Sequence, residues 1–126
     1  MLTACRELVA RGARRFKFVD RSFNAGIEAV LPVLEFFVTV PAPALEVQFE
    51  MVPDRFPEPL RAVLRRAPAG RLRLELGIQT FNPEVAARLD RRQDNAAVEA
   101  TLRFLRDETR VTVHADLLAG LPGESL

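Results

Sequence analysis

The stretch LELGIQTFNPEVAARLDRR, residues 74–92, contains a strand-to-helix switch that decides the fold. Apolar and polar residues alternate up to Gln79, which is the pattern of a half-buried strand. A helical pattern begins only a few residues later. Packing alone does not explain why the strand ends on a polar Gln79, so this residue is a first candidate for a functional role.

The helix after this strand has clear sequence signals. Asn82 is suited to cap the helix, Pro83 to occupy its first position, and Glu84 to interact with its positively polarised N-terminus. We expect Arg91 and Arg92 at the C-terminal end of the same helix, where cations interact favourably with the helix dipole. These signals explain the abrupt switch without a ligand.

Strand and helix patterns alternate along the whole chain. Strands are expected over residues 15–20, 45–50, 72–79 and 111–116. Helices are expected over residues 3–13, 27–38, 58–67, 83–91 and 97–108. This alternation is typical of βαβ crossovers and a parallel sheet, either in a β/α barrel or in an open doubly wound sheet. Pro32 should kink or split the helix that contains it.

Three of the expected strands have one apolar and one polar face, because successive residues of a strand point to opposite sides. The polar faces carry Glu46, Gln48, Glu50, Arg73, Glu75, Gln79, Thr112, His114 and Asp116. Parallel strands are normally apolar on both faces, and unpaired buried charges are costly. The pattern therefore predicts a wide or incompletely closed barrel with a polar lumen. Lys17 could join this lumen, but the phase of the first strand stays open.

Polar residues also mark the strand ends. In parallel α/β folds, ligands bind beyond the carboxyl ends of the strands. Asp20, Glu50, Gln79 and Asp116 should therefore cluster at one edge of the sheet, and we favour a binding site there. The alternative interpretation is that each residue merely begins a turn.

Composition limits the possible functions. The chain has 126 residues with a net charge of +1, which does not favour a nucleic-acid partner. No apolar run approaches the ~20 residues that span a bilayer, so no membrane association is expected. One cysteine, Cys5, permits neither an internal disulfide nor a multi-cysteine metal site, which fits a reducing, cytoplasmic setting.

The motifs together resemble a known family. LELGIQTFNPEVAARLDRRQD followed by VHADLLAGLPGES is similar to radical S-adenosylmethionine enzymes of the coproporphyrinogen-dehydrogenase-like type. FKFVDRSFN and FEMVPD look closest to the subgroup with a cobalamin-binding domain. The resemblance covers residues 3–126. It implies an oxidoreductase or transferase that cleaves S-adenosylmethionine reductively to a 5′-deoxyadenosyl radical, which acts on a small-molecule substrate.

The resemblance also assigns roles to individual residues. Glu50 and Gln79 match residues that hydrogen-bond the ribose of S-adenosylmethionine. Arg91 matches the arginine that binds the carboxylate of that cofactor. Asp116 matches an aspartate that contacts the cofactor, and Asp20 lies where the family approaches its methionine amino group. This last match is loose, because the usual glycine pair is absent.

The sequence departs from the family in what it lacks. There is no CxxxCxxC loop to hold a [4Fe-4S] cluster, and the cobalamin-binding module is not present. We therefore expect residues 1–126 to be one incomplete barrel domain, a fragment truncated at both ends. It should depend on missing portions of a parent chain, be inactive alone and self-associate through unpaired sheet edges. The alternative is a non-catalytic module that binds a nucleotide-like ligand or serves in assembly.

Overall fold

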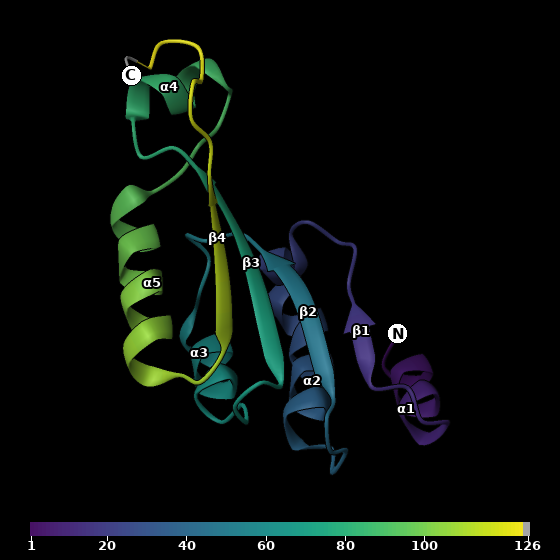
Figure 1. Ribbon diagram of the computed structural model, residues 1–126. Coiled ribbons are helices and arrows are strands. Elements are labelled where there is room, and N and C mark those ends of the chain that lie inside the picture. Colours follow the sequence, from purple (N-terminus) through teal and green to yellow (C-terminus); the bar gives the residue numbers. More distant parts are fainter. Residues whose placement is uncertain (125–126) are drawn as a thin grey trace.

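The computed structural model describes residues 1–124 and shows four parallel strands alternating with helices (Figure 1). The strands are β1 (Arg15–Lys17), β2 (Glu46–Met51), β3 (Leu72–Gln79) and β4 (Thr112–Leu117). The helices are α1 (Leu2–Ala10), α2 (Ile27–Thr39), α3 (Glu58–Arg65), α4 (Pro83–Arg88) and α5 (Asn95–Glu108), with a 3-10 helix, η1, over Phe23–Gly26. The sheet order is β1-β2-β3-β4, with every neighbouring pair parallel. The predicted α/β alternation is confirmed.

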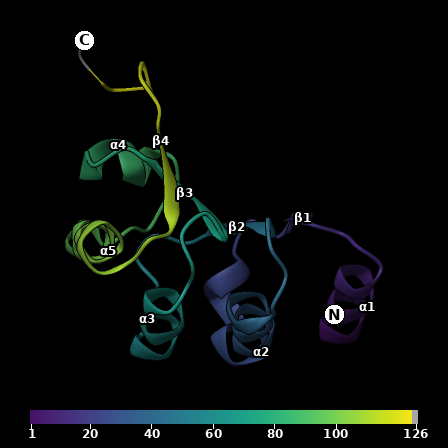
Figure 2. The same ribbon diagram turned by 60° about the horizontal axis from the view of Figure 1, so that its bottom comes forward.

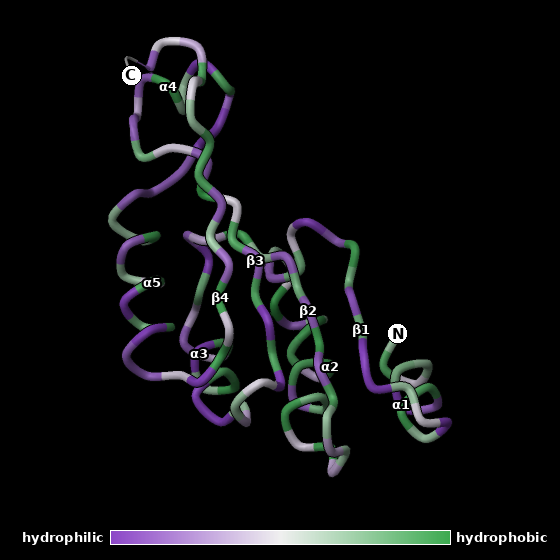
Figure 3. Tube along the Cα trace, in the orientation of Figure 1, coloured by the Kyte–Doolittle hydropathy of each residue, from purple (hydrophilic) through white to green (hydrophobic). Residues whose placement is uncertain are grey.

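The helices pack on one face of the sheet and leave the other face uncovered. Figure 2 shows α1, α2, α3 and α5 along the same side of the strands. Alternate residues of β2 and β3 face these helices and are buried, whereas the residues between them are only half-buried. The hydropathy colouring follows the same alternation along these strands (Figure 3). The polar face predicted from the sequence is therefore the uncovered face.

The structure shows which residues of the first strand face the core, a point that the sequence left open. Phe16 and Phe18 pack against the core, and Phe18 stacks on Phe49 with ring centroids 4.7 Å apart. Lys17 lies between them and is exposed, so it belongs to the polar face beside Gln48. The strand ends at Lys17, earlier than expected, so Val19 is not part of the sheet.

The expectation that Pro32 would kink or split its helix is wrong as far as splitting is concerned, because α2 runs continuously from Ile27 to Thr39. Pro32 itself is exposed, so water can reach the backbone where the intrahelical hydrogen bond is lost. On the opposite side, Leu34 and Phe37 are fully buried in the core. Their packing holds the helix together across the proline.

Among the described residues, no helix combines the length and the apolar character needed to cross a membrane. Three of the exposed apolar side chains lie next to the edge strands of the sheet. Val19, which follows β1, is 87% exposed, and Leu117 and Leu118 at the end of β4 are 62% and 48% exposed.

These edges generate a prediction about association. β1 and β4 each have one neighbour in the sheet, so each presents unpaired backbone groups on its other side. We expect the 126-residue chain to form dimers or larger species whose fraction rises with concentration, as measured by static light scattering. The substitution Leu117→Lys should reduce association by placing a charge on the β4 edge. A monodisperse monomer at high concentration would contradict the prediction.

Candidate functional site

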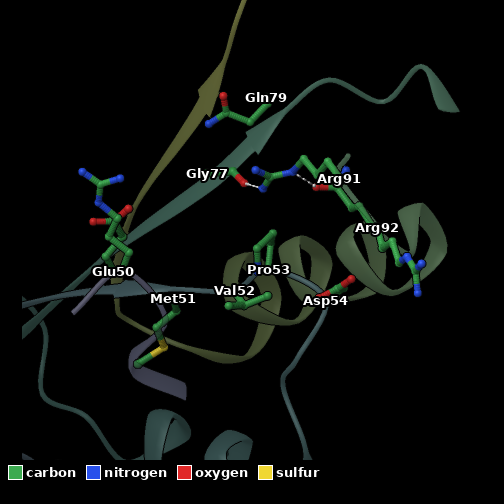
Figure 4. A pocket seen from close by; sticks show the side chains of 11 residues that line it. Glu50, Met51, Val52, Pro53, Asp54, Gly77, Gln79, Arg91 and Arg92 are labelled. Carbon is green, nitrogen blue, oxygen red and sulfur yellow. Dashed lines mark hydrogen bonds between the residues drawn. The ribbon is translucent and has the colours of Figure 1, made fainter. Parts of the chain in front are cut away.

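A pocket of about 370 Å³ opens at the carboxyl ends of β2 and β3 (Figure 4). Its lining residues come from the turn after β1, the end of β2 with its following loop, the end of β3, and the loop after α4. They are Arg21, Glu50, Met51, Val52, Pro53, Asp54, Gly77, Gln79, Arg91, Arg92 and Gln93. The pocket therefore lies at the strand edge where the sequence predicted a site.

Gln79 ends β3 in an unusual backbone conformation. The β3–β4 register shifts between Gly77 and Gln79, where three β3 residues face only Asp116 and Leu117 of β4. Gln79 has a φ of 71°, in the left-handed region that costs a residue with a Cβ about 1–2 kcal/mol. Bulges of this kind re-aim side chains next to functional sites. The polar residue that packing did not explain therefore lies at a bulge and lines the pocket.

The absence of a side chain at Gly77 gives the amide of Gln79 its space. A Cβ placed on Gly77 would lie 3.3 Å from Gln79 Nε2, closer than an ordinary van der Waals contact. The bulge itself is anchored by a hydrogen bond of 2.8 Å from the Leu118 backbone N–H to the Gln79 carbonyl. The chain thus fixes the Gln79 backbone on one side and keeps room for its side chain on the other.

Helix α4 is capped as predicted at its N-terminus. The Asn82 side chain accepts hydrogen bonds from the backbone N–H groups of Glu84 and Val85, at 3.0 and 3.3 Å. Pro83 occupies the first helical position, as predicted. This capping produces the abrupt strand-to-helix switch.

The C-terminus of α4 corrects the expected placement of Arg91 and Arg92, because the helix ends three residues before Arg91, at Arg88. Asp90 has a φ of 51°, its N–H donates to the Ala87 carbonyl, and the Arg91 N–H donates to the Ala86 carbonyl. These two bonds form a Schellman motif, which reverses the chain direction after a helix. Arg91 therefore owes its position to this reversal and not to the helix dipole.

Arg91 reaches from this turn back to the sheet. Its Nη2 donates a hydrogen bond to the Gly77 carbonyl, and its Nε donates to Gln93 Oε1 at 3.4 Å. Figure 4 shows the Arg91 side chain directed toward Gly77, whereas Arg92 points away from it. Gln93 in turn donates from Nε2 to the Thr80 carbonyl at 3.1 Å and to Asn95 Oδ1 at 3.0 Å. Gln93 thus ties the arginine to the end of β3.

The loop after β2 is held by one buried amide. Asn24, which is 3% exposed, donates to the carbonyls of Val52 and Arg55 at 2.9 and 2.6 Å. Its Oδ1 accepts from the Val52 N–H at 2.7 Å. Because Val52 and the two residues after it line the pocket, Asn24 shapes one wall of the site without touching the pocket.

The structure brings together three of the five predicted site residues. Glu50, Gln79 and Arg91 line the same pocket. Asp116 pairs with Gly77 across the β3–β4 ladder but is not among the lining residues. Asp20 is also outside the lining: its Oδ1 accepts from the Ser22 N–H at 2.9 Å and stabilises a local turn.

Other pocket residues were missed by sequence reasoning. Asp54 and Gln93 line the pocket, but neither lies on a predicted strand end. Arg21 was not missed: it lies beside Asp20 in the turn that the resemblance places near the methionine amino group, and it lines the pocket. Asp54 and Gln93 lie in loops whose course the alternation pattern does not specify.

Among residues 1–124, no group of three or more His, Cys, Asp or Glu side chains could hold a metal ion. The single cysteine, Cys5, is buried in α1. Burial raises the pKa of its thiol above the ordinary value, which disfavours the thiolate that binds iron. The described residues therefore do not fit a [4Fe-4S] cluster.

Comparison with known proteins defines the class of the fold. No family model matches the chain, and no curated protein matches it by sequence. By structure, the chain has the α/β fold of part of a radical S-adenosylmethionine enzyme, with four parallel strands alternating with helices.

Two matching structures are those of the radical S-adenosylmethionine methyltransferase TsrM from Kitasatospora setae. The form with cobalamin and a [4Fe-4S] cluster has a TM-score of 0.74 and covers 94% of this chain. The form with tryptophan substrate and the analogue aza-SAM has a TM-score of 0.76 and covers 98%. Sequence identity is 20% in both cases, and the match spans 24% of the TsrM chain.

The positive φ of Gln79 generates a prediction about the free energy of unfolding. Gln79→Gly should keep or raise the free energy of unfolding, by up to about 1 kcal/mol, because glycine adopts a positive φ without steric cost. Urea unfolding followed by circular dichroism measures this. Gln79→Asn is the matched control, because asparagine keeps an amide and tolerates the same φ. A loss of more than about 1 kcal/mol in the glycine variant would show that the side chain holds the bulge.

The buried amide of Asn24 generates a second prediction. Asn24→Ala should lower the free energy of unfolding by about 2–3 kcal/mol, because it leaves the Val52 N–H and the Arg55 carbonyl without a protein partner. Asn82→Ala removes the exposed cap of α4 and should cost only about 1 kcal/mol. Equal losses in the two variants, measured by urea unfolding, would argue against a special role for the Asn24 network.

Proposed function

We propose that this chain forms the part of a radical S-adenosylmethionine enzyme that holds S-adenosylmethionine at the carboxyl edge of its sheet. The observation that carries the proposal is the shared pocket of Glu50, Gln79 and Arg91. Its volume of about 370 Å³ lies at the lower end of the ~300–1,000 Å³ common for small-molecule sites. The fold match with TsrM supports the proposal but covers only 24% of that chain.

The pocket residues fit the polar groups of this cofactor. The carboxylate of Glu50 can accept hydrogen bonds from ribose hydroxyls, and the amide of Gln79 can both donate and accept. The guanidinium of Arg91 suits the carboxylate of the methionine moiety, because its planar fork pairs with both oxygens. Gln93 would keep that guanidinium oriented, since it accepts from Arg91 Nε. Asp116 and Asp20 lie beside this set, outside the pocket lining.

Bound S-adenosylmethionine would supply a sulfonium centre open to reductive cleavage or methyl transfer. The contribution of this chain is to bind and orient the nucleoside and amino-acid ends of the cofactor on fixed elements. The described residues offer no ligand set for an iron–sulfur cluster. We therefore assign no redox step to them and propose that any cluster, and any cobalamin, is held by residues outside this sequence.

A second candidate function is binding without catalysis. The same pocket could hold a nucleotide-like ligand in a non-catalytic module, and the exposed β4 could serve in assembly. Leu117 and Leu118, 62% and 48% exposed, favour an assembly role for that edge. This candidate predicts ligand binding that does not depend on the methionine moiety.

Ligand titration tests the proposal. We expect S-adenosylmethionine to bind the chain weakly in NMR experiments, and Arg91→Gln to weaken binding at least about tenfold, because a hydrogen-bonded charge pair is lost. 5′-Methylthioadenosine lacks the carboxylate, so its binding should not change in this variant. Gln79→Ala should weaken the binding of both ligands.

The matched control is Arg103→Gln, which removes the same charge from an exposed pair with Glu99 on α5. It should leave both affinities unchanged. If Arg91→Gln weakened both ligands equally, or if S-adenosylmethionine bound no better than adenosine, the proposed role of Arg91 would be wrong. The non-catalytic candidate would then be preferred.

A further inference from the structure

The uncovered face of the sheet carries a second pocket, at the opposite end of the strands from the first. It is lined by Arg15, Phe16, Lys17, Glu46, Gln48 and Arg73. These residues come from β1, β2 and the beginning of β3. Three of the side chains are cationic, and only Glu46 is anionic. This basic pocket has no assigned role in the proposed cofactor site.

The charges of the basic pocket are poorly compensated. Arg73 Nη2 lies 3.5 Å from Glu46 Oε1, and Arg73 Nε is enclosed without any hydrogen-bond partner. Among the described residues, Arg15 and Lys17 form no ion pair. A donor that is buried without a partner is uncommon in folded proteins and calls for an explanation.

The neighbouring carboxylate of Glu75 forms no ion pair with Arg73. Glu75 follows Arg73 on the same face of β3, but its Oε1 accepts a hydrogen bond from Gln48 Nε2. Among the described residues outside this pocket, only Arg65, Arg66, Arg103 and Arg106 form ion pairs; Arg65, for example, lies 2.8 Å from Glu108. Among residues 1–124, Arg73 alone has a buried side-chain nitrogen or oxygen without a hydrogen-bond partner, so this unsatisfied donor is specific to the basic pocket.

We propose that the basic pocket binds the carboxylate or phosphate group of an organic anion. Arg73 and Lys17 offer complementary contacts, because a guanidinium pairs with two oxygens in a plane and an ammonium acts as a point charge. A bound anion would offset the uncompensated charge of Arg73. Half-burial on the sheet would make this contact stronger than one at a fully exposed site.

The position of the basic pocket defines a length for the ligand, on the basis of the proposed function. Arg73 and Gln79 are six residues apart on β3, which corresponds to roughly 20 Å at about 3.3 Å per residue. Both lie on the polar side that the helices leave uncovered. A substrate anchored here by its anionic group could extend along the sheet, with its reacting end toward the cofactor edge.

Titration of the labelled chain with inorganic phosphate and with succinate tests the proposal. We expect saturable NMR shifts at Lys17, Gln48 and Arg73 with at least one of the two anions. Tighter binding of phosphate would identify a phosphate as the preferred group, and tighter binding of succinate would identify a carboxylate. No saturable shift in the basic pocket with either anion would overturn the proposal.

Variants make the test specific. Arg73→Gln and Lys17→Gln should each weaken anion binding about fivefold, the effect of one partly exposed charge. Glu46→Gln should tighten it, because the only carboxylate of the basic pocket is removed. Lys17 is exposed on a short edge strand, so its variant should fold even if the Arg73 variant does not. Arg103→Gln, with the same loss of charge on α5, should have no effect; an equal weakening would mean non-specific attraction.

The same samples separate this proposal from the proposed function. Gln79→Ala should weaken S-adenosylmethionine binding and leave phosphate or succinate binding unchanged. If an anion binds the basic pocket but S-adenosylmethionine does not bind the chain, the anion site stands and the cofactor proposal fails. If Gln79→Ala abolishes anion binding as well, the basic pocket is not a separate site.

Discussion

The one-sided packing of the sheet is the constraint on which the other features depend. All the apolar surface of β2 and β3 faces the helices, and Phe49 and Leu74 at its centre are fully buried. The other face therefore cannot be apolar without exposing a large hydrophobic surface to water. Polar residues on that face leave it free to hold ligands. The alternation in the sequence thus specifies the packing direction and the chemical character of the open face together.

The conformation of Gln79 makes sense within this constraint. An unstrained residue could end β3 equally well, so packing does not require a positive φ at this position. The surrounding structure nevertheless holds it, through the hydrogen bond from Leu118 and the space left at Gly77. Strain that a fold maintains in this way is commonly found at functional sites. The bulge therefore supports a binding role for Gln79 independently of any resemblance.

The sequence predicted those features that depend on local chemistry or on strand period. The four strands, the polar face and the cap by Asn82 all follow from residue types at fixed spacing. It placed Glu50 and Gln79 at one edge because parallel strands share their carboxyl ends. It could not predict the early end of α4, because Asp90 takes the conformation that usually marks a glycine. The continuity of α2 across Pro32 also depended on tertiary packing, which overrides a local preference.

Long-range hydrogen bonds were the second feature that could not be predicted from the sequence. Asn24 holds a loop about thirty residues away in the sequence, and no periodic pattern reports such a contact. Gln93 donates to the Thr80 carbonyl, thirteen residues earlier, after the Schellman motif has turned the chain back, so this contact could not be inferred before that turn was known. Asp20 shows the opposite case: a polar residue near a strand end stabilises its own turn. Position near the edge therefore does not by itself place a side chain in the pocket.

The two pockets of the sheet differ in how their charge is compensated, and this difference bears on what they do. In the carboxyl-edge pocket, Arg91 already has two hydrogen-bond acceptors, Gly77 and Gln93, so its orientation is set before any ligand arrives. Pre-orientation reduces the entropy lost on binding. In the basic pocket, Arg73 has one long ion pair and an unsatisfied donor, so a ligand would supply compensation that the chain itself lacks. The first arrangement favours geometric selection of a ligand, and the second favours selection by charge.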